Sequence, residues 1–140
     1  MKHINYILIF IFSLIINSCN ESIQIQHLSG YWEINSVTLN GKEVKNFPFS
    51  NTVDYFILNQ NNSGFRKKVK PRIDGGFDIN LHQMDFKIDK NKNGIYLIYG
   101  EGKNFIESIT KIDSINLHLS NNDGYLYKYK RFYPKNYLNE

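Results

Sequence analysis

The chain has 140 residues, which allows one domain, and its 17 basic and 13 acidic side chains give a mild net charge of +4. Its single cysteine excludes an intrachain disulfide and a cysteine-based metal site. The sequence contains no alanine, the residue that most favours helices, and this argues against a helical domain.

Residues 1–18 have the pattern of a secretory signal peptide. Lys2 and His3 precede an apolar run from Ile4 to about Ile16. This run is too short to span a bilayer, which needs about 20 apolar residues, but it has the length of a signal peptide's apolar region. The pattern predicts export, and export argues against nucleic acid as a partner.

The sequence Ile16-Asn17-Ser18-Cys19 resembles a bacterial lipobox, with an aliphatic residue three positions before the cysteine and a small residue just before it. The resemblance implies that the signal is removed and that Cys19 carries lipid, with acyl chains such as palmitate. The other interpretation is a plain signal peptide with an incidental thiol. No Asp follows Cys19, and only Glu21 is acidic nearby, which favours a lipid-anchored outer-membrane protein facing the periplasm.

Residues 19–27 form a short polar tether, and from Leu28 on the chain has the pattern of strands and tight turns. Asn40-Gly41 is a strong hairpin signal. Apolar residues alternate with polar ones in three clear runs, which are Phe77, Ile79 and Leu81, then Met84, Phe86 and Ile88, and then Ile115, Leu117 and Leu119. This period of two predicts sheet that covers one core. Eight or nine strands fit either a sandwich or a closed up-and-down barrel, followed by a tail over residues 134–140.

Two short motifs stand at the ends of the strand region. The first is Leu28-Ser29-Gly30-Tyr31-Trp32, and the second is Tyr127-Lys128-Tyr129-Lys130-Arg131. Together they resemble the lipocalin (calycin) pattern and the small lipocalin-like lipoproteins that are frequent in the Bacteroidetes. The resemblance implies an all-β fold with a single antiparallel up-and-down barrel of about eight strands over residues 28–133. It also implies that Gly30, Trp32 and Arg131 form a structural plug rather than a ligand site.

The last predicted strand carries three tyrosines on the face of Arg131. If Arg131 points inward, the period of two places Tyr125, Tyr127 and Tyr129 inside as well. Buried tyrosine hydroxyls need polar partners, so this face is a candidate for contact with a small hydrophobic or amphipathic ligand. The alternative is that the rings fill a solid barrel.

A basic segment is the second candidate. Five positive charges lie within eight residues, at Arg66, Lys67, Lys68, Lys70 and Arg72. They could contact anionic lipid headgroups or an acidic envelope protein. Lysines that protect a solvated edge strand produce the same pattern.

Catalytic and metal-binding patterns are absent from the sequence. His27, His82 and His118 are scattered, without the spacing of a zinc site or of a catalytic triad. We therefore expect no metal, no cofactor and no enzymatic activity. Two functions remain open, namely a ligand-binding envelope lipoprotein, or a solid-core module that contacts envelope proteins and takes up no small molecule.

Overall fold

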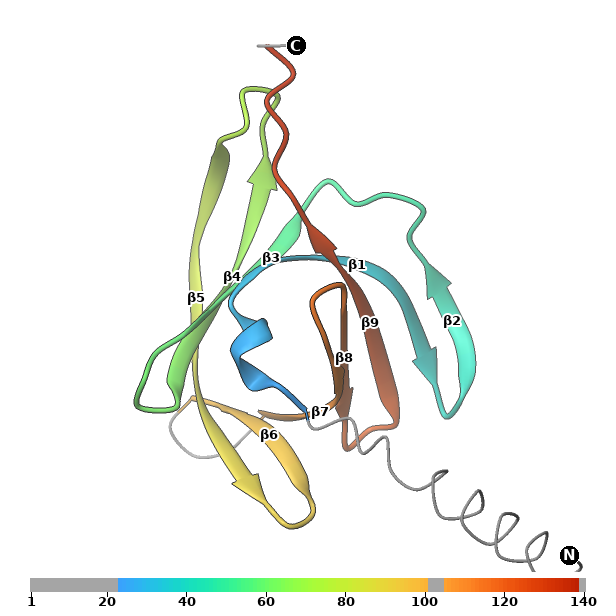
Figure 1. Ribbon diagram of the computed structural model, residues 1–140. Coiled ribbons are helices and arrows are strands. Elements are labelled where there is room, and N and C mark those ends of the chain that lie inside the picture. The colour runs from blue at the N-terminus through green and yellow to red at the C-terminus, as the bar shows by residue number, and fades with distance from the viewer. Residues whose placement is uncertain (1–22, 101–104, 139–140) are drawn as a thin grey trace, which may run out of the picture.

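The computed structural model describes residues 23–100 and 105–138, apart from the side chains of Asn80 and Leu81 (Figure 1). These residues form nine strands and one short 3-10 helix. Their bounds are η1 Ile25–Leu28, β1 Gly30–Leu39, β2 Lys42–Asn46, β3 Val53–Leu58, β4 Ser63–Pro71, β5 Phe77–Asn91, β6 Gly94–Tyr99, β7 Phe105–Ile112, β8 Asn116–Asn121 and β9 Tyr125–Phe132. No helix in this part of the chain has the length and apolar character needed to cross a membrane.

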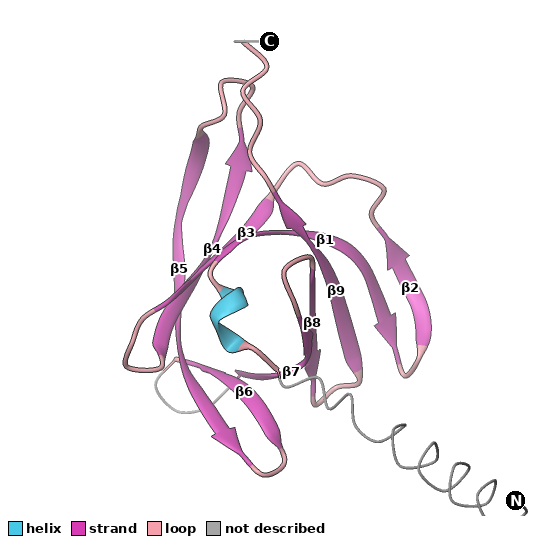
Figure 2. Cartoon of the chain, in the orientation of Figure 1, coloured by secondary structure: helices cyan, strands magenta, loops and turns pink. Residues whose placement is uncertain are grey.

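The strands form one closed antiparallel barrel. From β3 to β9 each strand pairs with the next one in the chain, and β9 then pairs with β1 over nearly its whole length. The first half of β1 closes the ring by pairing with β3, while its second half pairs with β2, which stands outside the ring (Figure 2). The predicted eight-stranded up-and-down barrel is therefore confirmed, and the sandwich is excluded.

The predicted hairpin at Asn40-Gly41 joins β1 to β2. Both residues have positive φ, at 49° and 82°. Such angles belong to the tight turns that match the twist of two paired strands, and asparagine and glycine adopt them most readily. The turn lets β2 fold back on β1.

The core lies inside the ring and is complete within it. Its buried residues all fall between Leu28 and Tyr129, and they come from η1 and from every barrel strand except β4. Residues 20–140 thus contain the whole barrel with its own hydrophobic core, as an independently folding domain requires. Two predicted inward residues differ, because Ile79 is 67% exposed and Ile115 is 55% exposed, while Leu117 and Leu119 are fully buried. Ile115 lies in the turn before β8, where the alternation has not yet begun.

One end of the barrel is closed by η1 and Trp32. Leu28 of η1 and the Trp32 indole are fully buried, and Trp32 Nε1 donates a hydrogen bond of 2.8 Å to the Leu28 carbonyl. The Arg131 guanidinium lies 3.8 Å from the centroid of the Trp32 ring. It also donates hydrogen bonds to the carbonyls of Ser29, His27 and Ser114. Arg131 therefore links residues 27–29, which precede β1, to the last strand, β9.

Gly30 leaves room for this arginine. A Cβ built on Gly30 would lie 2.3 Å from Arg131 Nη1, and Gly30 has a φ of +127°, which side chains rarely adopt. Glycine is therefore required here both by conformation and by close approach.

We expect Gly30→Ala to destabilise the barrel more than Gly41→Ala. Both changes strain a positive φ, at about 1–3 kcal/mol each, but only Gly30→Ala also displaces Arg131, because nothing lies within 4 Å of a Cβ at Gly41. Urea denaturation of the two variants measures the difference. Equal losses would show that the Arg131 contact contributes nothing to stability.

Candidate ligand-binding site

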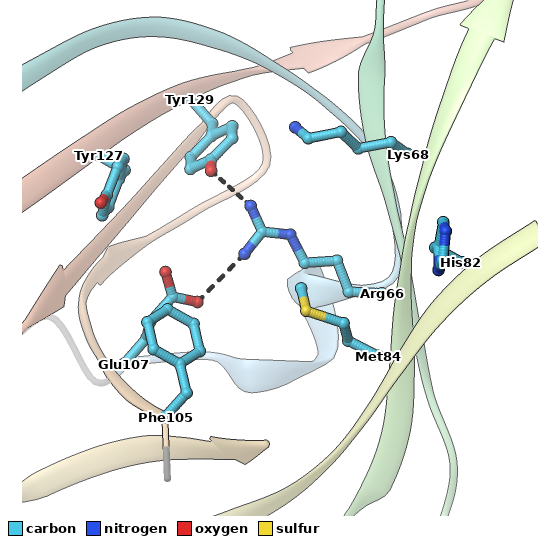
Figure 3. A pocket seen from close by; sticks show the side chains of 8 residues that line it. All are labelled: Arg66, Lys68, His82, Met84, Phe105, Glu107, Tyr127 and Tyr129. Carbon is cyan, nitrogen blue, oxygen red and sulfur yellow. Dashed lines mark hydrogen bonds and ion pairs between the residues drawn. The ribbon is translucent and has the colours of Figure 1, made fainter. Parts of the chain in front are cut away.

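A pocket of about 400 Å³ lies between four strands of the barrel (Figure 3). Each strand contributes two side chains that are two positions apart. They are Arg66 and Lys68 of β4, His82 and Met84 of β5, Phe105 and Glu107 of β7, and Tyr127 and Tyr129 of β9. Because side chains alternate across a strand, each pair points to the same face. The pocket is thus built by the inward rows of strands that are far apart in the sequence.

An irregularity in β5 shapes one wall. Lys67 pairs with Gln83, but Val69 pairs with Ile79. Residues 80–82 of β5 therefore have no paired residue on β4. Extra residues of this kind bend a strand and re-aim its side chains. The bend lies at His82, one of the lining residues, and opposite Lys68.

The floor of the pocket is an ionic network centred on Arg66. The Arg66 side chain is only 10% exposed, and its Nη2 donates to Asp54 Oδ2 at 2.9 Å and to the Tyr129 hydroxyl at 2.8 Å. Its Nη1 donates to Glu107 Oε2 at 3.2 Å, an oxygen that also accepts a hydrogen bond of 2.7 Å from the Tyr99 hydroxyl. Five strands, from β3 to β9, are tied together by this network.

The two carboxylates of the network have pKa values that are shifted in opposite directions. Burial alone would raise the pKa of Asp54, but the charges and hydrogen bonds of Arg66 and Lys68 outweigh it, so the pKa lies below its ordinary value of 3.8. Glu107 has only Arg66 and the Tyr99 hydroxyl as favourable partners. Burial, helped by the charge of Asp54, therefore raises the pKa of Glu107 above its ordinary value of 4.5.

Lys68 supplies the second cation of the site. Its Nζ lies 3.1 Å from Asp54 Oδ1, yet 60% of its side chain is exposed. An ammonium has three donors, and one is used by Asp54. Lys68 can therefore offer hydrogen bonds and charge to a molecule in the pocket.

The three predicted tyrosines differ in their placement. Tyr129 is buried and Tyr127 half-buried, and both line the pocket. Tyr125 does not line it and instead stacks on Tyr127, with 6.1 Å between ring centroids. The candidate ligand face is thus Tyr127 and Tyr129, without direct contact from Tyr125.

The basic segment is not one outward surface. Arg66 is buried inside the barrel and Lys68 lines the pocket, because the alternation of β4 turns both inward. Lys67 lies on the other face, with Nζ 5.2 Å from the Phe65 ring centroid, and Lys70 is exposed. Arg72 forms ion pairs with Asp74 and Asp78 in the β4–β5 hairpin. The expectation of five cations on one partner surface is therefore wrong for Arg66, which is buried, whereas Lys68 is exposed at the pocket.

Six residues of the site were not predicted as site residues from the sequence, namely Asp54, His82, Met84, Tyr99, Phe105 and Glu107. A signal exists for the two acids, since Val53-Asp54-Tyr55-Phe56 and Phe105-Ile106-Glu107-Ser108-Ile109 each place a carboxylate in an apolar strand. A carboxylate on an inward position requires a buried cation. The pairing of both acids with Arg66 depends on barrel closure and is not visible in the sequence.

Two other hollows have a different character. One, of about 670 Å³, runs beside β4 and β5, is lined by a mixture of polar and apolar residues, and borders Gly100, next to undescribed residues. The other, of about 270 Å³, lies where the C-terminal residues pass the β4–β5 hairpin. Within the described residues, no cluster of three or more His, Cys, Asp or Glu side chains could hold a metal ion.

Replacing Arg66 by Met is expected to cost about 3–5 kcal/mol of unfolding free energy, because two buried carboxylates lose their shared cation. The loss should shrink as the pH falls, since protonation removes the uncompensated charges. Urea denaturation across the acid range measures this.

The triple variant Arg66→Met, Asp54→Asn, Glu107→Gln should recover much of that stability, because no buried charge remains. Lys67→Met, on the outer face of the same strand, is the matched control and should change little. If Arg66→Met were no more destabilising than Lys67→Met, the network would not stabilise the fold.

The chain is similar to one family of known domains and to two solved structures. Residues 28–119 match the family described as a lipocalin-like domain. No curated protein matches the chain. Two crystal structures are similar: a lipocalin-like protein from Bacteroides uniformis ATCC 8492 (15% identity, TM-score 0.45, covering 76% of this chain and 99% of the other) and an uncharacterized protein from Bacteroides eggerthii DSM 20697 (11%, 0.45, 75% and 99%). With the family matched over more than half of its length, the chain belongs to the lipocalin-like domain family.

Proposed function

We propose that the protein binds a small amphipathic ligand in the pocket between β4, β5, β7 and β9. The observation that carries the proposal is the composition of this pocket, where the apolar side chains of Met84 and Phe105 stand beside the charged groups of Arg66, Lys68 and Glu107. Such a lining suits a molecule with an apolar body and a polar end. The volume of about 400 Å³ lies in the range of about 300–1,000 Å³ that is usual for small-molecule sites.

The partial exposure of the apolar walls supports this proposal. Met84 is 44% exposed and Phe105 is 39% exposed, although both are on strands that form the barrel. Covering them with an apolar ligand removes that surface from water, which contributes about 25 cal/mol per Å². The entropy lost on association offsets part of this gain, so we expect modest affinity. The basic segment supports the protein-interaction alternative less well, because Arg66 is buried and Lys68 lines the pocket.

We expect native mass spectrometry of residues 20–140, produced in the natural host, to show an added mass that is lost on denaturation. Met84→Trp should abolish it, because the larger ring fills the pocket from a half-exposed position. Ile79→Trp is the matched control, since Ile79 is on the same strand, is 67% exposed and does not line the pocket. A wild-type mass without addition, also after incubation with lipid extracts, would refute ligand binding.

We also propose that the barrel is held at the outer membrane, on the periplasmic side, by lipid on Cys19. Cys19 lies outside the described residues, and the support is the lipobox-like Ile16-Asn17-Ser18-Cys19. Acyl chains hold a protein to a membrane at about 0.8 kcal/mol for each buried CH₂ group, and stable anchoring needs more than one chain. Anchoring would keep the ligand pocket close to the lipids of the envelope.

Cys19→Ser is expected to prevent both lipidation and membrane association. Mass spectrometry of the chain and labelling with palmitate in cells measure the first, and cell fractionation measures the second. A wild-type chain that carries no lipid, or a Cys19→Ser chain that still carries it, would contradict the anchor.

A further inference from the structure

The charges around the pocket balance only when Glu107 is ionised. Arg66 and Lys68 supply two positive charges, and Asp54 and Glu107 supply two negative ones. If Glu107 is protonated instead, the group keeps one net positive charge beside an apolar pocket. A monoanion that enters the pocket would then restore neutrality.

The geometry identifies which cation would receive the anion. Arg66 already donates to Asp54, Glu107 and Tyr129, and it is held in place by them. Lys68 has one such partner and a largely exposed side chain that reaches into the pocket (Figure 3). Its long stem lets the ammonium turn toward a ligand while Asp54 keeps its bond to Arg66. Lys68 is therefore the group that would bind an anionic oxygen.

The geometry also identifies which group would change its protonation. Asp54 is paired on both oxygens, with Arg66 and Lys68. Glu107 is 2% exposed, lines the pocket, and makes both of its hydrogen bonds through Oε2. Among the described residues no hydrogen bond reaches Oε1, so a proton on Oε1 would break no existing contact. A negative charge brought into the same pocket would favour that proton.

We propose that the pocket is selective for a monoanionic amphiphile, whose charged group pairs with Lys68, and that binding is accompanied by the uptake of one proton on Glu107 Oε1. This inference rests on the proposed function, because it names the ligand class of the same pocket. The proton comes from solvent, no covalent bond other than O–H forms, and the site is electrically neutral before and after binding.

The charged and titratable groups around Glu107 are consistent with this proton uptake, and β8, which pairs with β7, places the neutral Asn121 opposite Glu107. Arg66 of β4 and the Tyr99 hydroxyl of β6 favour the charged form. Asp54 of β3 disfavours it, as does burial, which is the largest influence and leaves the pKa raised. From β9, Tyr129 occupies another donor of Arg66, and Tyr127 adds only a neutral hydroxyl. The pKa of Glu107 is therefore already raised by burial before any ligand arrives.

The experiment is calorimetric titration of residues 20–140 with three probes that share a decyl chain and differ in charge. Decyl sulfonate is anionic throughout the pH range used, decanol is neutral, and decyltrimethylammonium is cationic. Each titration is run between about pH 5 and pH 8, in pairs of buffers with different ionisation enthalpies, so that proton uptake is read directly. Because the sulfonate itself does not titrate, every proton counted is taken up by the protein.

We expect decyl sulfonate to bind most tightly, with an uptake approaching one proton where Glu107 is ionised in the free protein. Its affinity should fall by up to about tenfold per pH unit above the pKa of Glu107. Glu107→Gln should bind with no proton uptake and no pH dependence from this site. Lys68→Met should lose about tenfold or more in affinity for the sulfonate, at unchanged affinity for decanol.

Two further variants complete the test. Lys70→Met removes a cation of the same strand that does not line the pocket, and its sulfonate affinity should equal that of the wild type. His82 also lines the pocket, so His82→Gln is the control that must retain the proton uptake. Uptake that disappears in His82→Gln but persists in Glu107→Gln would overturn the assignment.

The outcomes separate this inference from the proposed function. Equal binding of decanol and decyl sulfonate, or tighter binding of the cationic probe, would overturn the selectivity for anions while leaving an amphiphile pocket in place. If none of the three probes binds, the pocket takes up no amphiphile of this size and both proposals fall.

Discussion

The fold and the candidate site both depend on one interaction, in which the buried guanidinium of Arg66 lies between two carboxylates. Arg66 on β4 reaches Asp54 on β3 and Glu107 on β7, which lies on another wall of the barrel. Ions buried this deeply are tolerated only when they are paired and hydrogen-bonded. The inward rows of these strands must therefore keep their register, because a slip of one residue would turn each charged group to the outside and leave its partners unpaired.

A polar network of this kind explains why the barrel is not filled uniformly. Below it, toward η1, the interior is packed with apolar residues such as Trp32, Leu117 and Phe56, all fully buried. Around the network the polar groups need defined geometry, and hydrogen-bond lengths and angles prevent the close packing that apolar side chains achieve. The pocket lies at this boundary. The barrel can accordingly have a solid, plugged end and a ligand site, which are features that the sequence presented as alternatives.

The fold could be predicted from the sequence, but most of the site could not. Strand alternation, the Asn40-Gly41 turn and the two terminal motifs are local signals, and they were sufficient for an eight-stranded antiparallel barrel. The site depends on which inward rows meet across the barrel. Tyr127 and Tyr129 could be assigned to the interior from their spacing to Arg131, but Arg66 was assigned to the outside because it stands in a run of lysines. Composition over a window hides the alternation within it, and here alternate residues of one basic run face opposite sides of the sheet.

The buried and half-buried charges at the pocket affect both the stability of the barrel and the ligand selectivity that we propose for the pocket. Asp54 has two cations and Glu107 shares one of them, so the two carboxylates are not equivalent although both are buried. Asp54, with its pKa lowered, contributes stability that is complete above its ordinary pKa and is lost as the pH falls through the lowered value. Glu107, with its pKa raised, has the opposite sign, since its ionisation weakens the fold as the pH rises. A ligand anion that keeps Glu107 protonated removes that penalty, so the anion stabilises the barrel by the same interaction that gives the pocket its preference for negative charge.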